Sequence, residues 1–340
     1  MNTSDLPMVF FTVVAQLAVG AFLVLGVVQL YAIRKHSASA ARVIAPVLYA
    51  IGPALVLGLV VSMFHMHDVA NTLNVITNFG TSWLSREIVF GCAFAAVGFL
   101  FALLEWFQKG SFVLRQVVAA IAALLGIGLL VCQSMIYYVL EAVPAWHSWA
   151  VPYLFFATAL LLGCVAVQAA MMVTTAVRLR NAKTADGDEP IEADAVKVDD
   201  EPQPAKGGLK ARIAEINAPT SQTEWELTAQ VIKGTALGGA VVAVLILIAY
   251  PIYLGGLSQG DSAAVAAAGA LAGGALWFRL ALTGLVALLL GFFVYKMAGQ
   301  ATLAKAKGLA VLVIVVFAIA LVAEFIGRSL HYAVLLKSGL

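Results

Sequence analysis

The chain has 340 residues, of which 62% are hydrophobic and only 11% are charged, with a mean hydropathy of +0.98. Ordinary soluble domains carry about a quarter charged residues, so this composition excludes a soluble globular protein and indicates an integral membrane protein. The formal net charge of +2 says little, because the side of the membrane on which basic residues lie matters more than their sum.

Eight continuous apolar stretches follow one another along the chain. A helix needs about 20 residues to cross a bilayer, so each stretch predicts one crossing. The runs are continuous rather than alternating, which favours an all-α integral membrane protein, a bundle of about eight transmembrane helices. The stretches are Met8–Ile33, Val43–Phe64, Ile88–Phe107, Val117–Leu140, Val151–Val177, Thr235–Leu257, Trp277–Met297 and Leu309–Phe325.

Basic residues gather after the odd-numbered stretches, and the positive-inside rule places those loops in the cytoplasm. Both termini are therefore predicted to lie outside, which agrees with an even number of crossings. The basic residues that set this orientation are Arg34, Lys35, Arg42, Lys109, Arg115, Arg178, Arg180, Lys183, Lys296, Lys305 and Lys307.

One polar insert divides the chain into three parts. Helices one to five occupy residues 1–177 and helices six to eight occupy residues 234–340. Residues 178–233 carry many charges and few large apolar side chains, so they are predicted to form an unfolded cytoplasmic linker. Within it, Gly208–Asn217 has the pattern of a short amphipathic helix. The Ala- and Gly-rich segment Gly260–Gly274 is predicted to be a loosely structured external loop.

Ionisable side chains gather at the predicted outer helix ends. Such groups are costly at membrane depth, so each is a functional candidate, although single charges there also snorkel or pair without further function. Glu324 and Arg328 are spaced to pair across one turn. The candidates for lining a shared pocket are Arg86, Glu87, Arg279, Glu324 and Arg328, with His65 at the end of helix two.

His65 and Glu87 form the predicted catalytic pair. Oxidation of a quinol releases two protons and two electrons, so its site needs a base that works near neutral pH, and an imidazole meets this need. A carboxylate near water can take the proton onward, and a nearby Arg can hold an anionic intermediate. His67 is predicted to be structural, and His331 is predicted to lie in the outer tail after helix eight.

Neither haem nor a protein-bound metal is predicted. Cys92, Cys132 and Cys164 lie alone inside apolar runs, without the companions that a zinc or iron–sulfur site needs. No His lies in the middle of a predicted helix, where the axial ligands of a haem would face each other. A quinol would therefore be an exchangeable substrate rather than a resident cofactor.

Five short motifs lie in or beside the predicted helices: Phe10-Phe11-Thr12, Ser62-Met63-Phe64-His65, Leu84-Ser85-Arg86-Glu87-Ile88, Pro144-Ala145-Trp146-His147-Ser148 and Glu324-Phe325-Ile326-Gly327-Arg328. In these motifs the chain resembles the membrane-anchor subunit of bacterial dimethyl sulfoxide reductase. The resemblance implies eight helices in the bacterial cytoplasmic (inner) membrane, menaquinol oxidation without haem, and quinol-binding roles for His65 and Glu87. It also implies two partners, an iron–sulfur electron-transfer subunit and a molybdopterin catalytic subunit.

Two other functions stay open at this point. A secondary transporter would place polar or broken helices near the midplane, where the sequence offers Gln16, Gln133, Gln168, Pro53 and Pro251. A purely structural anchor would need the outer charges to pair only among themselves. The terminal electron acceptor, the quinone type, the direction of electron flow and the stoichiometry of the complex do not follow from these residues.

Overall fold

The computed structural model describes residues 6–35, 37–63, 77–185 and 209–337. Eight of its helices are long and apolar enough to cross a membrane, which confirms the predicted number. Short connections and N-terminal caps such as Ser82 and Ser111 set several of their starts. The helices of the first half are α1 (Leu6–Lys35), α2 (Ser37–Met63), α4 (Trp83–Trp106), α5 (Phe112–Tyr138) and α6 (Ala150–Ala185).

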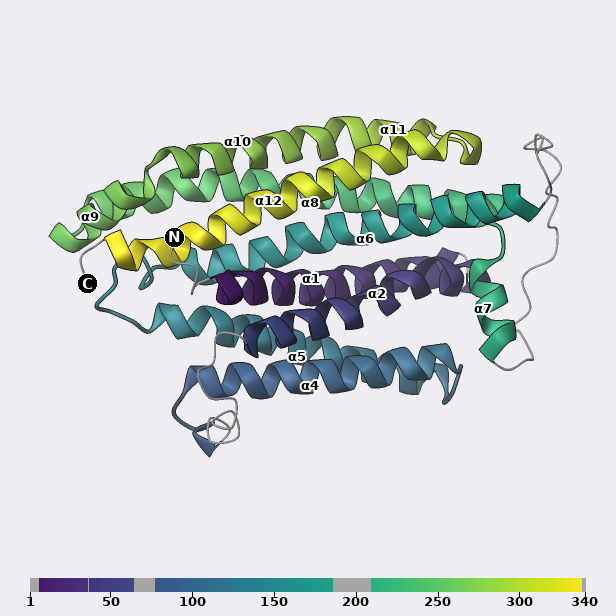
Figure 1. The fold of residues 1–340 in the computed structure, drawn as a ribbon, viewed down its shortest axis with the longest axis horizontal. Coiled ribbons are helices and arrows are strands. Elements are labelled where there is room, and N and C mark those ends of the chain that lie inside the picture. Colours follow the sequence, from purple (N-terminus) through teal and green to yellow (C-terminus); the bar gives the residue numbers. More distant parts are fainter. Residues whose placement is uncertain (1–5, 36, 64–76, 186–208, 338–340) are drawn as a thin grey trace.

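The second half contributes three crossings. The middle one is composite, because its backbone passes from an α-helix through a short π-helix and back to an α-helix. The elements are α8 (Gln222–Ser258), α10 (Gly274–Leu288) with η2 (Leu289–Val294) and α11 (Tyr295–Gln300), and the turn η3 (Leu303–Lys305) leading into α12 (Ala306–Lys337). Two shorter helices, α7 (Leu209–Asn217) and α9 (Ser262–Leu271), lie at opposite ends of the bundle (Figure 1).

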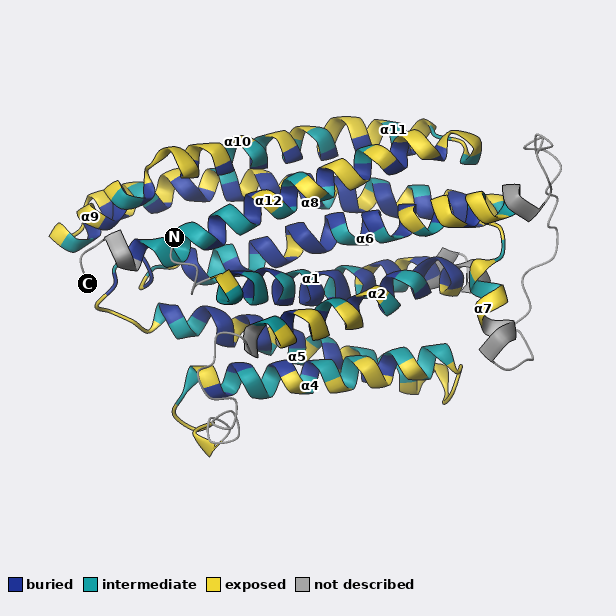
Figure 2. Cartoon of the chain, viewed as in Figure 1, coloured by how far each residue is buried: buried dark blue, intermediate teal, exposed yellow. Residues whose placement is uncertain are grey.

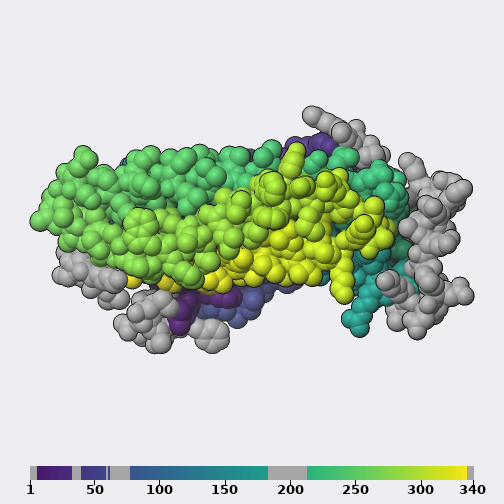
Figure 3. Space-filling view, turned by 90° about the horizontal axis from the view of Figure 1, so that it is seen from above, coloured from purple at the N-terminus to yellow at the C-terminus, as the bar shows by residue number. Residues whose placement is uncertain are grey.

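Helix α6 joins the two halves. It packs against α1 and α5 on one side and against α8 and α12 on the other. Figure 2 shows α1 and most of α6 buried, while the last turns of α6 are exposed. One apolar core is formed by α1, α2, α4, α5 and α6, and a second core by α6 and α8 to α12. Seen from above, the surface is formed mainly by the second half (Figure 3).

The backbones of α1 and α6 touch each other. A Cβ atom added to Gly20 would collide with the carbonyl group of Ala159, and one added to Gly163 would collide with the backbone of Gly20. Small residues let transmembrane helices approach this closely, where backbone packing contributes to helix association. The crossing of α1 and α6 therefore fixes the centre of the bundle.

The two termini lie at the same end of the bundle, together with α9, while α7 lies at the other end (Figure 1). An even number of crossings requires this arrangement. Which of the two ends faces the cytoplasm stays a prediction from the basic residues. We call the end that carries the termini the terminal end, and the end that carries α7 the α7 end.

Two segments differ from their predicted structure. Both ends of the predicted linker 178–233 are helical, because α6 continues to Ala185 and α8 begins at Gln222, where Ser221 and Glu224 form a capping box. The short helix predicted over Gly208–Asn217 is present as α7. The prediction of a loose loop over Gly260–Gly274 is wrong, since Asp261 caps α9 there. Its ten residues are too few to cross a bilayer.

Candidate functional site

Glu87 lies in the first turns of α4 and is buried. The side chain of Gln133, from α5, lies beside its carboxylate. The sequence paired Glu87 with His65, but His65 and His67 lie outside the described residues, so this pairing stays a prediction. Helix α2 ends at Met63, two residues before His65.

Arg86 points away from the interior. Its guanidinium donates hydrogen bonds to the carbonyl oxygens of Phe79 and Gly80, at 2.9 and 2.7 Å, and lies 4.3 Å from the centre of the Trp83 ring. These contacts close the turn that precedes α4. Arg86 therefore shapes the entry to α4 and is not brought together with Arg279, Glu324 and Arg328.

Arg279 and Glu324 form an ion pair inside the bundle. Nη2 of Arg279 lies 3.0 Å from Oε2 of Glu324, and each side chain is only 2% exposed. Thr158 of α6 donates a hydrogen bond of 2.7 Å to the same carboxylate oxygen. Nε of Arg279 also donates to the carbonyl oxygen of Ala323 at 3.2 Å. The pair therefore links α10 to α12 and, through Thr158, to α6.

A glycine makes room for this ion pair. A Cβ atom on Gly327 would collide with the guanidinium of Arg279, so the guanidinium lies directly on the backbone of α12. On its other side, Tyr250 of α8 places its ring 4.7 Å from the guanidinium carbon. The motif Glu324-Phe325-Ile326-Gly327-Arg328 thus contains both the acidic partner of Arg279 and the glycine that leaves space for its guanidinium.

Arg328 takes different partners from those that its spacing suggested. Its Nη2 donates to Oε1 of Gln16 on α1 at 3.0 Å, and its guanidinium lies 3.8 Å from the centre of the Phe155 ring on α6. Glu324, one turn earlier, pairs with Arg279 instead. Arg328 therefore joins α12 to the first half of the chain.

A chain of hydroxyl groups on the same helices was not predicted from the sequence. The hydroxyl oxygens of Tyr137 (α5) and Tyr332 (α12) are 2.8 Å apart, and that of Tyr332 is 3.1 Å from Oγ1 of Thr12 (α1). Tyrosines near helix ends are usually interfacial anchors, which hid their role. In the sequence, these two tyrosines were marked only by lying on the same helices as Gln133 and Arg328.

The prediction that His331 lies in an outer tail is wrong, because α12 continues to Lys337. Its imidazole packs against the rings of Tyr137 and Trp146, with ring centres 4.6 and 5.4 Å apart. Nε1 of Trp146 donates a hydrogen bond of 2.9 Å to the carbonyl oxygen of His331. The loop before α6 and the end of α12 are thereby joined.

A small polar cavity of about 40 Å³ lies on the inner side of α12. Four polar atoms of its lining have no hydrogen-bond partner among the described residues: Nη1 of Arg279, Oε1 of Glu324, Nε of Arg328 and Nε2 of His331. A polar cavity of this size can hold a few water molecules, which would satisfy such atoms.

A larger, apolar groove of about 810 Å³ lies on the other side of α12. Leu330 lines both hollows, so α12 is the wall between them. Among the described residues of its lining, only Ser329 carries a side-chain hydroxyl, and Val61 brings the end of α2 to the groove. The lining residues are Leu6, Pro7, Val9, Phe10, Val61, Ala275, Phe325, Ile326, Ser329, Leu330 and Ala333.

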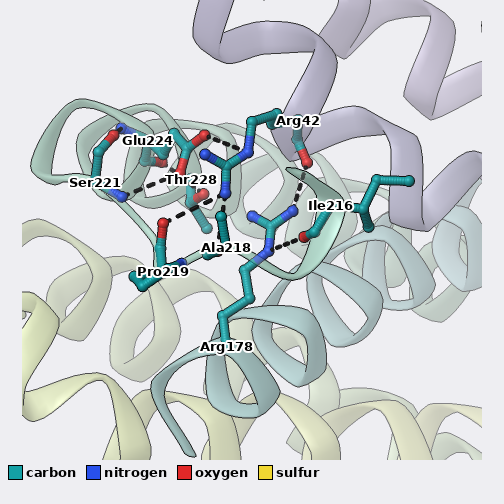
Figure 4. Close-up of polar contacts among 8 residues, drawn as sticks. All are labelled: Arg42, Arg178, Ile216, Ala218, Pro219, Ser221, Glu224 and Thr228. Carbon is teal, nitrogen blue, oxygen red and sulfur yellow. Dashed lines mark hydrogen bonds and ion pairs between the residues drawn. The ribbon is translucent and has the colours of Figure 1, made fainter. Parts of the chain in front are cut away.

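A second buried polar cluster lies at the α7 end (Figure 4). Nε of Arg42 on α2 is 3.2 Å from Oε1 of Glu224 on α8, and Nη2 of Arg42 donates to the carbonyl oxygens of Ala218 and Pro219. Arg178 of α6 donates to the carbonyl oxygens of Ile216 and Arg42 at 2.8 and 3.1 Å. Backbone carbonyls hold both guanidinium groups, so this cluster fastens the segment between α7 and α8 to the bundle.

The chain matches the model of the DMSO reductase anchor subunit (DmsC) family over residues 1–184, more than half of its length. It belongs to this family. The matched range runs from α1 to α6 and includes Thr12, Glu87 and Tyr137. Arg279, Glu324 and Arg328 lie outside it, so the resemblance seen in α12 stays a prediction.

Similar proteins with known names support the assignment to this family. The chain is 30% identical to the C chain of the anaerobic dimethyl sulfoxide reductase of Haemophilus influenzae over 165 residues, which are 48% of this chain and 58% of the relative. It is 32% identical to the protein of the same name in Escherichia coli, over 45% of this chain and 52% of the relative. The C subunit of the sulfite dehydrogenase of Allochromatium vinosum is 26% identical over 41% and 46% of the two chains. The chain therefore spans about half the length of these relatives.

Proposed function

We propose that this chain anchors a reductase complex of the dimethyl sulfoxide reductase type in the bacterial inner membrane and oxidises menaquinol there. In this proposal, electrons pass from the quinol to an iron–sulfur subunit and from it to a molybdopterin catalytic subunit. The single observation that supports it best is the apolar groove beside the end of α2, next to a buried network of polar side chains. Family membership supports the assignment as an anchor.

The groove has the properties that a quinol requires. A quinol carries two hydroxyl groups on a ring with a long apolar tail, so it reaches its site from the lipid and needs an apolar wall with a few polar groups beside it. The groove is lined by apolar side chains of α1, α2, α10 and α12. Its volume of about 810 Å³ suits one ring and the first part of a tail.

His65 and Glu87 are the proposed proton acceptors. His65 follows Val61, a groove residue, by four positions, which brings it close in sequence to the groove. Glu87 is buried on α4 beside Gln133. When the quinol gives up two electrons, its two O–H bonds break, and one proton passes to each of these groups.

Arg279, Glu324 and Arg328 are proposed to brace the pocket wall. Their contacts hold α12 against α6, α10 and α1. Because α12 separates the groove from the polar cavity, a displaced α12 would change the shape of the groove. Arg328 also adds a positive charge near the site, which stabilises an anionic quinol on its way to the oxidised form.

The terminal end of the bundle offers a surface for the iron–sulfur subunit. The loop between α5 and α6 is tied to α12 through Trp146, while Trp149 beside it is 48% exposed. Exposed aromatic side chains in a fixed loop are common at protein interfaces. We place the docking surface here because electrons must travel only a short way from the groove.

The test is purification of the tagged chain in mild detergent from anaerobically grown cells, followed by a quinol-oxidation assay on the material obtained. Iron–sulfur and molybdopterin subunits are expected to co-purify. The variants His65→Ala and Glu87→Gln should each lower quinol oxidation by about a hundredfold or more without loss of these partners.

Glu105→Gln is the matched control, because Glu105 lies at the far end of the same helix and pairs with Arg115 at 3.0 Å. Its activity should equal that of the wild type. A chain that purifies alone would refute the anchor assignment and favour a transporter. Unchanged quinol oxidation in both His65→Ala and Glu87→Gln would refute the mechanism and leave a structural anchor.

A further inference from the structure

The proposed groove and its proposed proton acceptor are separated in the fold. The groove is lined by α1, α2, α10 and α12, whereas Glu87 lies on α4 and faces α5. Glu87 is absent from the residues that line the groove. A proton released in the groove therefore needs a path between these helices, since it cannot cross an apolar interior unaided.

Three hydroxyl groups beside the groove connect α12 to α1 and α5. Tyr332 lies next to the groove residue Ala333 on α12, and its hydroxyl is 3.1 Å from Oγ1 of Thr12 and 2.8 Å from the hydroxyl of Tyr137. Thr12 donates its one hydroxyl proton to the carbonyl oxygen of Met8 at 2.7 Å, so it accepts from Tyr332, whereas in the contact of Tyr332 with Tyr137 either oxygen can be the donor. A hydroxyl group can both accept and donate a hydrogen bond. It can therefore relay a proton by accepting one proton while it donates its own to the next group.

The path continues from Tyr137 to Glu87 along α5. Gln133 precedes Tyr137 by four residues, so both side chains lie on the same face of the helix. Gln133 lies beside Glu87, although neither polar atom of its amide forms a hydrogen bond among the described residues. Glu87 therefore lies beside the face of α5 that carries Tyr137.

Aromatic rings pack around Tyr137. The ring of Tyr137 packs against those of Trp146, Phe155 and His331, with centres 5.0, 5.8 and 4.6 Å away. Tyr137 is buried. These rings shield the hydroxyl of Tyr137 from bulk water on this side, while its partner Tyr332 lies 2.8 Å away. The positive charge of Arg328 acts on both tyrosine hydroxyls and stabilises the transient negative charge on either.

We infer that Tyr332 and Tyr137 are positioning residues that relay one proton of the quinol to Glu87. Tyr332 accepts the proton from the quinol hydroxyl as it donates its own to Tyr137, and Tyr137 gives its proton to the Glu87 carboxylate. One quinol O–H bond breaks, one carboxyl O–H bond forms, and both tyrosines end neutral. The hydroxyl groups of Tyr332 and Tyr137 then rotate back to their starting orientations, in which Thr12 accepts a hydrogen bond from Tyr332. This inference rests on the proposed function.

The experiment compares Tyr137→Phe and Tyr332→Phe with Tyr253→Phe in the complete purified complex. Tyr253 also donates a hydrogen bond, of 2.6 Å to the carbonyl oxygen of Ala145, but takes no part in the path. Each relay variant should lower kcat for quinol oxidation by about tenfold to a hundredfold. KM for the quinol and binding of a quinol-analogue inhibitor should stay as in the wild type.

Solvent isotope effects separate a relay from a structural role. If proton transfer becomes rate-limiting, kcat of both relay variants should fall further in deuterium oxide than that of the wild type, and the double variant should be no slower than the slower single one. The Tyr253→Phe complex should behave as the wild type. Thr12→Val, which removes the hydroxyl that contacts Tyr332 and donates to the carbonyl oxygen of Met8, should show the same isotope effect in milder form.

Three results would overturn the relay. One is wild-type kcat in both relay variants. The second is a loss of inhibitor binding equal to the loss of kcat, which would mean a distorted pocket. The third, a complex that does not assemble with either Phe variant while Thr12→Val is fully active, would assign these tyrosines to folding. Failure of the proposed function is visible separately, as unchanged activity in His65→Ala and Glu87→Gln.

Discussion

Charged side chains inside this bundle are kept in place by several partners each. Arg279 contacts Glu324, the carbonyl oxygen of Ala323 and the ring of Tyr250, and Glu324 also accepts a hydrogen bond from Thr158. Away from water, a lone charge is costly, so a buried pair is stable only as long as both members are present. Each residue of the pair therefore depends on the other more than on any third partner.

Removal of one member should destabilise the protein more than removal of both. We expect Glu324→Gln and Arg279→Met to lower the free energy of unfolding by about 3–5 kcal/mol each, since each leaves one charge buried without its partner. The double variant should lose less than the sum of the two, because the charges disappear together. Thermal unfolding in detergent, or in bicelles, measures the differences.

A less buried counterpart is the pair Arg115–Glu105, whose side chains are 15% and 18% exposed, against 2% for each member of the pair Arg279–Glu324. Partial contact with solvent lowers the cost of a lone charge, so Glu105→Gln should lower the free energy of unfolding less than Glu324→Gln does. Equal losses in the single and the double variants of the buried pair would show that packing, and not charge pairing, is what the substitutions disturb.

At the scale of the helices, the connection between α7 and α8 is fastened to two other elements. Arg42 on α2 and Arg178 on α6 hold the carbonyl oxygens that precede α8, and the capping box of Ser221 and Glu224 sets where α8 begins. Hydrogen bonds from a charged donor are stronger than those between neutral groups. This cluster therefore ties both halves of the bundle together at the α7 end.

Loss of Arg178 should loosen this connection without harming the rest of the bundle. In Arg178→Ala, the carbonyl oxygen of Ile216 loses its donor, and trypsin should cut within α7 several times faster than in the wild type. Lys307→Ala is the control, because Lys307 is an exposed basic residue at the same end. Digestion followed by mass spectrometry gives the rates, and equal rates in the two variants would contradict a fastening role for Arg178.

The helices could be predicted from the sequence, but the helix faces that pack against each other could not. Continuous apolar runs gave eight crossings because length and composition decide whether a segment spans a membrane. In a membrane both lipid and protein neighbours are apolar, so apolar periodicity does not reveal which face is buried. The contact of Gly20 with Ala159 and the cavity behind α12 therefore could not be predicted from the sequence.

The candidate site was predicted in part, for a similar reason. Arg279 and Glu324 were found because charges at membrane depth stand out in an apolar sequence. Tyr137 and Tyr332 were not found, since tyrosine is common at helix ends and nothing local marks two of them as neighbours across 195 residues. His331 was misplaced because the end of α12 is only weakly apolar, and helix ends are the least certain boundaries.

At the scale of the whole molecule, the orientation of the bundle decides on which side of the membrane its partners dock. The groove, the hydroxyl path and the docking loop all lie at the terminal end, so the side on which this end lies is also the side on which the electron-transfer subunits would dock. Basic residues at the α7 end predict, through the positive-inside rule, that this end lies in the cytoplasm and the terminal end outside.

Cysteine labelling in intact spheroplasts tests this orientation directly. Ser262 at the start of α9 and Thr223 at the start of α8 are both exposed and lie at opposite ends of the bundle. A membrane-impermeant maleimide should label Ser262→Cys at once, and Thr223→Cys only after the membrane is opened. The wild-type chain, with Cys92 exposed on the side of α4 and Cys132 and Cys164 buried, provides the background. Labelling in the reverse order would place the groove at the cytoplasmic face, and the electron-transfer subunits would then dock from the cytoplasm.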